Sequence, residues 1–222
     1  TTTKAPYIEQ AVSNGEMYIE QPYELYSADN HATWQRLYAR MQDHWARYAN
    51  QRFLDGLETL CFEPTHVPRL EDVNRFMAPR TGFRAKAVSG FVPAFDFFDC
   101  LSRREFPTTI TIRDGQSLDY LPEPDIFHDI AGHVPMHTDP AFAETLVRFG
   151  ACAHLAADMV RDMSDREERR RRLSSIQNAL QRFFWFTVEF GLMRDASGQR
   201  VTVYGSGLLS SYGEIVHSVE SP

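Results

Sequence analysis

Residues 122–135 of the chain read PEPDIFHDIAGHVP, and this stretch brings two of its eight histidines close together. Over the five residues from His128 to His133 a regular α-helix turns through about 500°, so the two side chains would point about 140° apart. Two imidazoles at that angle cannot reach one metal ion at bonds of about 2 Å. Gly132 and Pro135 predict a break in the helix, which would let the two rings converge.

Two carboxylates flank the first of these histidines. Asp125 and Asp129 strengthen a metal interpretation, because a metal-bound imidazole usually donates its other N–H to a carboxylate or carbonyl. The alternative for Asp125, which follows Pro124 in a first helical turn, is stabilisation of the helix dipole. The histidine spacing alone is a weak signal, since core and helix-end histidines are its commoner explanation.

A third ligand is offered by residues 182–192, which read RFFWFTVEFGL. This stretch predicts a helix that is apolar nearly all round and therefore buried. A lone carboxylate such as Glu189 is costly there unless it is neutralised, paired or bound to a metal. The sequence leaves two explanations open, an ion pair with an arginine elsewhere in the chain or a bound cation.

Two histidines and one glutamate form the facial triad of non-haem Fe(II) sites, which keeps coordination positions open for oxygen and a cosubstrate. Zinc bound by the same residue types is the alternative metal. The HExxH pattern of zinc proteases is absent, because Asp129 follows His128 and the second histidine comes five residues later instead of four.

The rest of the chain predicts a mainly helical domain with minor short β strands. Apolar residues at helical spacing predict helices near residues 28–48, 53–60, 70–76, 93–101, 139–159 and 175–193. Alternating or β-branched residues predict strands at 83–89, 108–113, 201–204 and 214–218. Residues 165–172, DREERRRR, pair opposite charges four apart, which favours a solvated helix over a nucleic-acid patch.

Composition excludes several classes of protein. The 222 residues, 43% hydrophobic and 24% charged, are typical of one globular domain or at most two small ones. No apolar run approaches the roughly 20 residues that cross a bilayer, and no secretory leader precedes residue 10. The net charge of −7 argues against nucleic acid as a partner. Three widely spaced cysteines, Cys61, Cys100 and Cys152, predict free thiols and a cytoplasmic location.

Three stretches together resemble one known family. PEPDIFHDIAGHVP, WFTVEFGL and YGSGLLSSYGE occur in the order and spacing of the pterin-dependent aromatic amino acid hydroxylases, and are most like the bacterial phenylalanine hydroxylases. The resemblance continues through YSADNHATWQRLYAR, FLDGLETL, VSGFVP and FPTTITIR, so it covers residues 23–221. It implies a single basket-like, mainly helical catalytic domain over residues 23–222, with residues 1–22 as an N-terminal extension.

The resemblance also implies roles for individual residues. The iron ligands would be His128, His133 and Glu189. The amino acid substrate would contact Arg113, Pro122, Trp185 and Ser210, with Arg113 holding its carboxylate. The pterin would contact Gly90, Val92, Phe97 and Asp129, with Phe97 stacking on its ring. Supporting positions would be Asp125, Gln181, Phe184 and Glu214.

The activity implied is that of a monooxygenase that uses Fe(II), a tetrahydropterin and O2 to hydroxylate the ring of a free L-amino acid. Phenylalanine to tyrosine is the expected reaction, with the para and meta carbons both open. Tyrosine hydroxylation and a non-catalytic domain that binds or senses an aromatic amino acid are alternatives. A 2-oxoglutarate oxygenase is disfavoured by the order of the ligands. We expect a small-molecule substrate, no nucleic acid, no membrane, and a monomer or weak homo-oligomer.

Several positions depart from the family pattern. Asp129 stands where many members have Glu, Phe184 replaces a common Tyr, and Gln181 replaces a usual Ala. Because Gln181, Trp185 and Glu189 are spaced by four residues, we expect Gln181 to point into or beside the site. Substrate choice and the ring position attacked therefore stay open.

Two differences in length accompany these changes. The stretch between His133 and Glu189 is longer than usual around residues 165–172, and the chain stops at Pro222, before the family's usual C-terminal segment. We expect no regulatory domain before Tyr23 and no tetramerising helix, with part of the pocket wall missing or supplied elsewhere.

Overall fold

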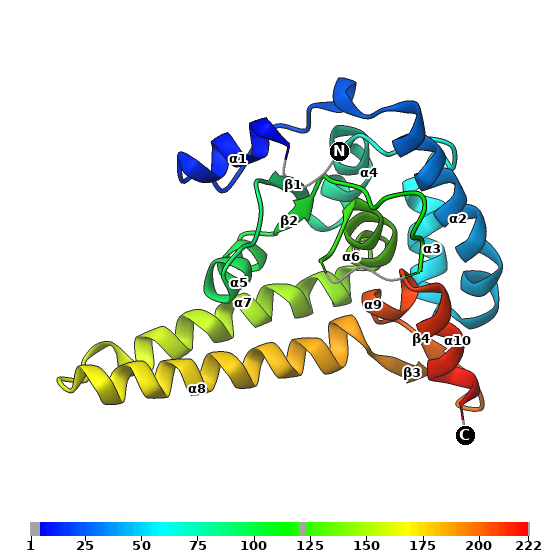
Figure 1. Cartoon of the computed structure of the whole chain (residues 1–222). Helices are drawn as coiled ribbons and strands as arrows, with labels where there is room; N and C mark the ends of the chain where they lie inside the picture. Colours follow the sequence, from blue (N-terminus) through cyan, green and yellow to red (C-terminus); the bar gives the residue numbers. More distant parts are fainter. Residues whose placement is uncertain (1–4, 120–122, 222) are drawn as a thin grey trace.

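The computed structural model describes residues 5–119 and 123–221 of the chain (Figure 1). The α-helices in these ranges are α1 Pro6–Ser13, α2 Ala28–Tyr48, α3 Gln51–Leu60, α4 Leu70–Thr81, α5 Ala94–Ser102, α6 Val134–His137, α7 Pro140–Arg161, α8 Arg166–Phe184, α9 Ser206–Leu209 and α10 Tyr212–Glu220. Three further helical segments that are not α-helical are η1 Tyr23–Leu25, η2 Phe127–His133 and η3 Trp185–Glu189. The strands are β1 Arg84–Val88, β2 Glu105–Thr109, β3 Leu192–Arg194 and β4 Val201–Val203. The described residues contain no helix with the length and apolar character needed to span a membrane.

Helix α2 illustrates how the sequence builds the core that supports the site. Ser27 caps it in a capping box, in which the Ser27 hydroxyl and the Asn30 side chain each accept the other's backbone N–H. Its apolar face buries Trp34 and Trp45 almost completely. The Trp34 ring packs edge-on against Phe127, 5.2 Å away, so the largest side chains of the core lie directly beneath η2.

The strands form two small sheets. β1 and β2 pair in parallel, from Arg84 opposite Glu105 to Val88 opposite Thr109, and β3 pairs with β4 in antiparallel fashion. The strand expected at 108–113 therefore begins and ends earlier. The strand expected at 214–218 is wrong, because those residues belong to helix α10. Packing of Ile215 into the core decides that segment, against its β-branched composition.

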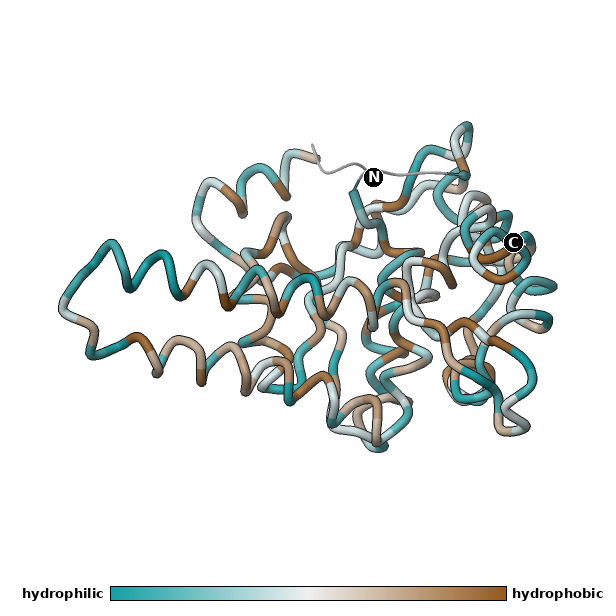
Figure 2. Tube along the Cα trace, turned by 90° about the horizontal axis from the view of Figure 1, so that it is seen from below, coloured by the Kyte–Doolittle hydropathy of each residue, from teal (hydrophilic) through white to brown (hydrophobic). Residues whose placement is uncertain are grey.

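Helices α7 and α8 form a long antiparallel hairpin that projects from the rest of the molecule (Figure 1). Hydrophilic residues gather at its far end (Figure 2). Asp165 caps α8 by accepting the backbone N–H groups of Glu167 and Glu168. The charge run and the helix expected from 175 are thus one continuous helix, and its last turn leads into η3.

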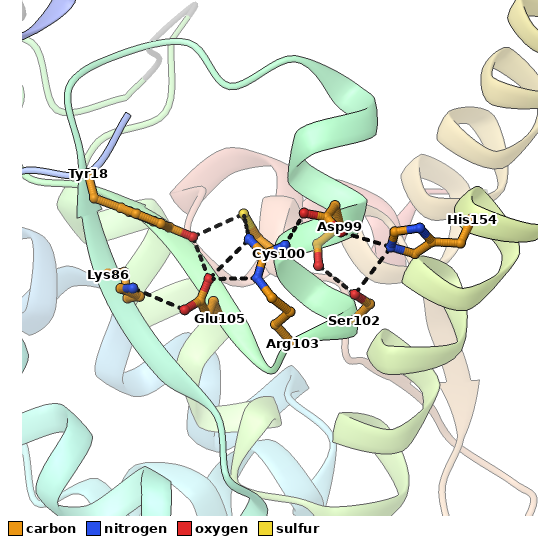
Figure 3. A network of polar contacts seen from close by, with 8 residues as sticks. All are labelled: Tyr18, Lys86, Asp99, Cys100, Ser102, Arg103, Glu105 and His154. Carbon is orange, nitrogen blue, oxygen red and sulfur yellow. Dashed lines mark hydrogen bonds and ion pairs between the residues drawn. The ribbon is translucent and has the colours of Figure 1, made fainter. Parts of the chain in front are cut away.

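The residues expected to form an N-terminal extension are joined to the edge of the first sheet. Tyr18 bridges to Val88, and the Ser89 N–H donates to the carbonyl of Met17 at 3.0 Å. The Tyr18 hydroxyl donates to Glu105 at 2.6 Å and contacts the Cys100 thiol at 3.1 Å. Figure 3 shows the network around it, which also includes Lys86, Asp99, Ser102, Arg103 and His154. The N-terminal segment that contains Met17 and Tyr18 is therefore attached to β1, β2 and α5.

Candidate metal centre and its flanking cavities

Both predicted ligand segments are π-helical turns, η2 over Phe127–His133 and η3 over Trp185–Glu189. A π-helix joins residues five apart by hydrogen bonds, so side chains five apart lie near the same face. The helix runs on from η2 into α6, and Gly132 has no positive φ. The expected break at Gly132 and Pro135 is therefore wrong, because a widened turn brings the two histidines together.

The three predicted ligands converge on one point. The Nε2 atoms of His128 and His133 lie 3.2 Å apart. Oε1 of Glu189 lies 3.1 Å from Nε2 of His133, and Oε2 lies 3.7 Å from Nε2 of His128. Ligands at right angles around a metal, with bonds of about 2.1 Å, are separated by about 3 Å. The donor atoms therefore fit three adjacent positions around one ion.

Asp129 offers a second carboxylate near this point. One of its oxygens lies within 4.8 Å of the ligand atoms of His128 and His133. Its Oδ2 accepts the backbone N–H of Thr109 at 2.6 Å, and burial raises the pKa of the side chain to about 7. The Glu189 carboxylate faces both Nε2 atoms, so it completes the ligand set and Asp129 lies at its margin.

The surroundings favour the protonation states that a metal requires. Burial alone would raise the pKa of Glu189, but His133, His128 and the Ser206 hydroxyl lower it to about 2. Burial lowers the pKa of His128 to about 4, which leaves its ring neutral at pH 7. Burial works in the same direction at His133, but Glu189 outweighs it and raises the pKa of that ring. A cation bound between them would replace the proton that these two side chains share.

Ser210 fixes the orientation of His128. Its hydroxyl lies 2.8 Å from Nδ1 of His128 and 2.8 Å from the carbonyl of Ser206. The hydroxyl has one proton, which it donates to that carbonyl, so it accepts the Nδ1–H of the histidine. The Nε2 lone pair of His128 is thereby directed at the point where the ligands meet.

A cavity of about 480 Å³ opens beside two of the three predicted ligands, His128 and Glu189. Of the residues predicted to contact or support the amino acid, it is lined by Arg113, Trp185, Ser210 and Glu214. Pro122 lies outside the described residues. Phe190, which the sequence did not single out, also lines the cavity, with its ring 4.7 Å from that of Trp185. Its position directly after Glu189 was the available signal.

Arg113 is held by a buried ion pair with Asp125. The guanidinium donates to both carboxylate oxygens, at 2.8 and 2.9 Å, and a third N–H donates to the carbonyl of Leu118 at 3.0 Å. Arginine has five such N–H groups, so two remain beyond these contacts within the described residues. Asp125 also accepts the backbone N–H of His128, and thus connects Arg113 to the ligand segment.

A second cavity, of about 550 Å³, is lined by all three predicted ligands, His128, His133 and Glu189. The four residues predicted to contact the pterin all line it: Gly90, Val92, Phe97 and Asp129. Val12 of α1 and the exposed Phe91 line it as well. The residues common to both cavities are Glu123, Pro124, His128 and Glu189. Two of the three predicted metal ligands therefore face both cavities.

Of the two α8 residues predicted to support the site, Gln181 is exposed and Phe184 is buried. The amide nitrogen of Gln181 donates to the carbonyl of Gln177. The expectation that it points into or beside the site is wrong, because the π-turn after Phe184 changes the register between α8 and Glu189. Phe184 is buried, with its ring 5.4 Å from that of Phe97, and so supports the second cavity from behind.

Curated relatives of this chain include bacterial and mammalian hydroxylases. It is 37% identical over 203 residues to the phenylalanine-4-hydroxylase of Chromobacterium violaceum, which covers 91% of this chain and 63% of that protein. It is 39% identical to the phenylalanine-4-hydroxylase of Ralstonia nicotianae, a match that covers 91% of this chain and 59% of that protein. It is 38% identical to the tyrosine 3-monooxygenase of Rattus norvegicus, a match that covers 89% of this chain and 37% of that protein. The chain thus spans less than two thirds of the length of these relatives.

Solved structures of a related hydroxylase match the fold of this chain. A crystal structure of the C. violaceum phenylalanine hydroxylase, described with bound iron(III) and oxidised 7,8-dihydrobiopterin, matches with a TM-score of 0.80 and 32% identity, covering 100% of this chain and 76% of that one. A second crystal structure of that enzyme, described with iron and phenylalanine, matches with a TM-score of 0.80, covering 98% of this chain and 74% of that one. The predicted mainly helical hydroxylase fold is confirmed.

A family profile described as biopterin-dependent aromatic amino acid hydroxylase matches residues 14–222. This range includes both π-helical turns and, apart from Val12, every residue that lines the two cavities. The chain therefore belongs to the biopterin-dependent aromatic amino acid hydroxylase family.

Proposed function

We propose that this protein is an iron- and tetrahydropterin-dependent monooxygenase that hydroxylates the ring of free L-phenylalanine, with tyrosine as product. The observation that carries the proposal is the convergence of His128, His133 and Glu189 beside two cavities, both of which His128 and Glu189 line. Such a placement lets one ion face a different small molecule in each cavity. Relatives described with iron, phenylalanine and dihydrobiopterin support the assignment.

The donor set fits iron. Two imidazole nitrogens and one carboxylate are the ligands of non-haem Fe(II) sites, with zinc as the main alternative. Nε2 of His128, Nε2 of His133 and the Glu189 carboxylate would hold the ion, which together with the reduced pterin would supply oxygen activation. The contributions of the chain itself are binding, orientation and the exclusion of water.

The amino acid would occupy the 480 Å³ cavity. The two remaining N–H groups of Arg113 would donate to its carboxylate, in a charge-assisted contact that Asp125 keeps in place. The Glu214 carboxylate, in the same cavity, would accept from its ammonium group. The rings of Trp185 and Phe190 would pack against the substrate ring and aim it at the ligands.

The pterin would occupy the 550 Å³ cavity. Phe97 would stack on its flat ring, supported from behind by Phe184. Gly90 and Val92 would lie along one edge, and Asp129 would accept a hydrogen bond from its N–H groups. Both molecules would then lie beside the ion, in adjoining cavities that orient them for reaction.

Product analysis tests the proposal. Purified protein loaded with Fe(II), and supplied with a reduced pterin, O2 and phenylalanine, is expected to form tyrosine, identified by chromatography and mass. The variant His128→Ala is expected to lose both the bound iron and the product. Absence of any tyrosine isomer with iron confirmed in the protein would contradict phenylalanine as substrate.

The same assay separates the alternatives. Formation of dihydroxyphenylalanine from tyrosine, with phenylalanine unreacted, would favour a tyrosine hydroxylase, the activity named for the rat relative. Tight phenylalanine binding without oxygen consumption would favour a sensor domain. A cytoplasmic location is also proposed, supported by Cys61, Cys100 and Cys152, which are unpaired in the described structure. The monomeric or weakly associated state stays a prediction.

A further inference from the structure

Ser206, the first residue of α9, lies against the carboxylate of Glu189. Its side chain is buried, with 2% of the residue exposed. Its hydroxyl lies 3.0 Å from Oε2 of Glu189 and 3.1 Å from the carbonyl oxygen of Val188. No role was predicted for this serine from the sequence, and it lines neither of the two cavities.

The single proton of this hydroxyl has two acceptors within reach. A hydrogen bond to an ionised carboxylate is shorter and roughly twice as strong as one to a neutral carbonyl. A glutamate that binds a metal ion does so as the ionised carboxylate. The Ser206 hydroxyl therefore donates mainly to Oε2 of Glu189, while Oε1 faces His133 at 3.1 Å.

Glycines make this contact possible. A Cβ atom on Gly205 would lie 2.5 Å from the carbonyl oxygen of Glu189, and one on Gly207 would lie 3.0 Å from the same oxygen. A Cβ atom on Gly132 would lie 2.9 Å from the carbonyl oxygen of Ser206. The backbone of α9 thus approaches both ligand turns, η2 and η3, as closely as glycine permits. The position of the Ser206 hydroxyl follows from this approach.

We propose that Ser206 is a positioning residue of the metal centre, which holds Oε2 of Glu189 so that the carboxylate binds the ion through one oxygen. With Ser210, one turn later and bonded to His128, it makes α9 the element that orients two of the three ligands. This inference rests on the proposed function, because it requires that the three residues bind a metal. A carboxylate held at one oxygen leaves more of the coordination sphere to the two small molecules.

Replacement of the hydroxyl tests this role. Ser206→Ala is expected to raise the dissociation constant for Fe(II) and Co(II) about tenfold, as is usual for the loss of a group that orients a metal ligand. With Oε2 released, a change from one-oxygen to two-oxygen binding is expected, seen as a changed visible absorption spectrum of the Co(II) protein. Ser218→Ala is the matched control, since in the described part of the chain that hydroxyl donates to the carbonyl of Ile215 in its own helix α10.

The outcomes separate this inference from the proposed function. An unchanged dissociation constant and Co(II) spectrum in Ser206→Ala would overturn it, and would assign the hydroxyl to the Val188 carbonyl alone. If Ser206→Ala does not fold, as judged by melting of the metal-free protein, Ser206→Cys replaces it with a weak donor of similar size, and the same change in affinity and spectrum is expected. Wild-type protein that binds neither ion would instead contradict the proposed function.

Discussion

The Nε2 atoms of His128 and His133 lie 3.2 Å apart although the residues are five positions apart in the chain. A regular α-helix would point the two rings about 140° away from each other. The π-helical turn η2 removes this difference, and the carbonyl of Ser206 packs against its inner side at Gly132. The metal centre therefore depends on the width of one helical turn.

Gly132→Ala is expected to disturb this turn. The added Cβ would lie 2.9 Å from the Ser206 carbonyl oxygen and 3.1 Å from Cβ of Ser210, so α9 must move away. We expect a loss of about 1–3 kcal/mol in the free energy of unfolding, together with weaker metal binding. Urea unfolding and metal titration measure the two effects. Gly213→Ala, where no contact within 4 Å of the new Cβ is found among the described residues, should neither lower stability nor weaken metal binding.

A bound metal is expected to stabilise the folded protein. An ion that binds only the native state adds about 2.7 kcal/mol when its free concentration is 100 times the dissociation constant. Fe(II) added without oxygen should therefore raise the melting temperature, and a chelator should reverse the rise. Glu189→Gln should melt at one temperature with or without the metal, whereas Glu168→Gln, far along α8, should respond as the wild type does. An equal metal response in Glu189→Gln would remove that residue from the ligand set.

Asp125→Asn is expected to destabilise the protein by about 3–5 kcal/mol, because it leaves the buried Arg113 guanidinium without its countercharge. Asp119→Asn is the control, since the Arg40–Asp119 pair is largely exposed and worth less than about 1 kcal/mol. Chemical denaturation of both variants gives the comparison. Similar losses in the two would mean that the Arg113–Asp125 pair has no special role in stability.

The N-terminal helix is expected to affect the pterin and not the amino acid. Val12 of α1 lines the 550 Å³ cavity and lies 3.7 Å from the position of a Cβ on Gly90. Removal of residues 1–15 should raise the KM for the pterin several-fold and leave the KM for phenylalanine unchanged. Steady-state kinetics with each ligand varied in turn measure this difference. A change confined to the phenylalanine KM would contradict the assignment of the two cavities.

Stability should fall in mild acid because of His31. Burial, and to a lesser degree His66, lower the pKa of His31, and its Nδ1 accepts the backbone N–H of Val67 at 3.1 Å. The other rings that face it are Tyr23 and Tyr26. The unfolded chain therefore takes up the proton first, so stability is lost as the pH falls below about 6.5 and on through the lower folded pKa. Thermal melts across this range should show a smaller loss in His31→Gln than in the wild type.

Much of the fold could be predicted from the sequence, because it depends on residue type and spacing. The cap at Ser27 and the apolar face of α2 decide that helix locally. The cost of burying Glu189 indicated either an ion pair or a bound cation, and the resemblance to the family selected the ligand set. The π-helical turns could not be predicted in this way. The extra residue that widens such a turn is held in place by packing against α9, which comes later in the sequence. The wrong expectation for Gln181 follows from the same omission.

Two other errors have a similar cause. The segment containing Ile215 has the composition of a strand, but contacts with the core make it the helix α10. Ser206 was missed because a serine between two glycines resembles a loop. Gly205 and Gly207 were the available signal, since paired glycines mark places where a backbone comes close to another group.

The lining residues that the two cavities share have a thermodynamic consequence. Glu123, Pro124, His128 and Glu189 face both chambers, so an occupant of either one alters the surface that the other occupant meets. Linkage then requires reciprocity: whatever factor phenylalanine applies to the affinity for the pterin, the pterin must apply to the affinity for phenylalanine. Cooperativity between two ligands would thus arise inside a single chain, with no second subunit.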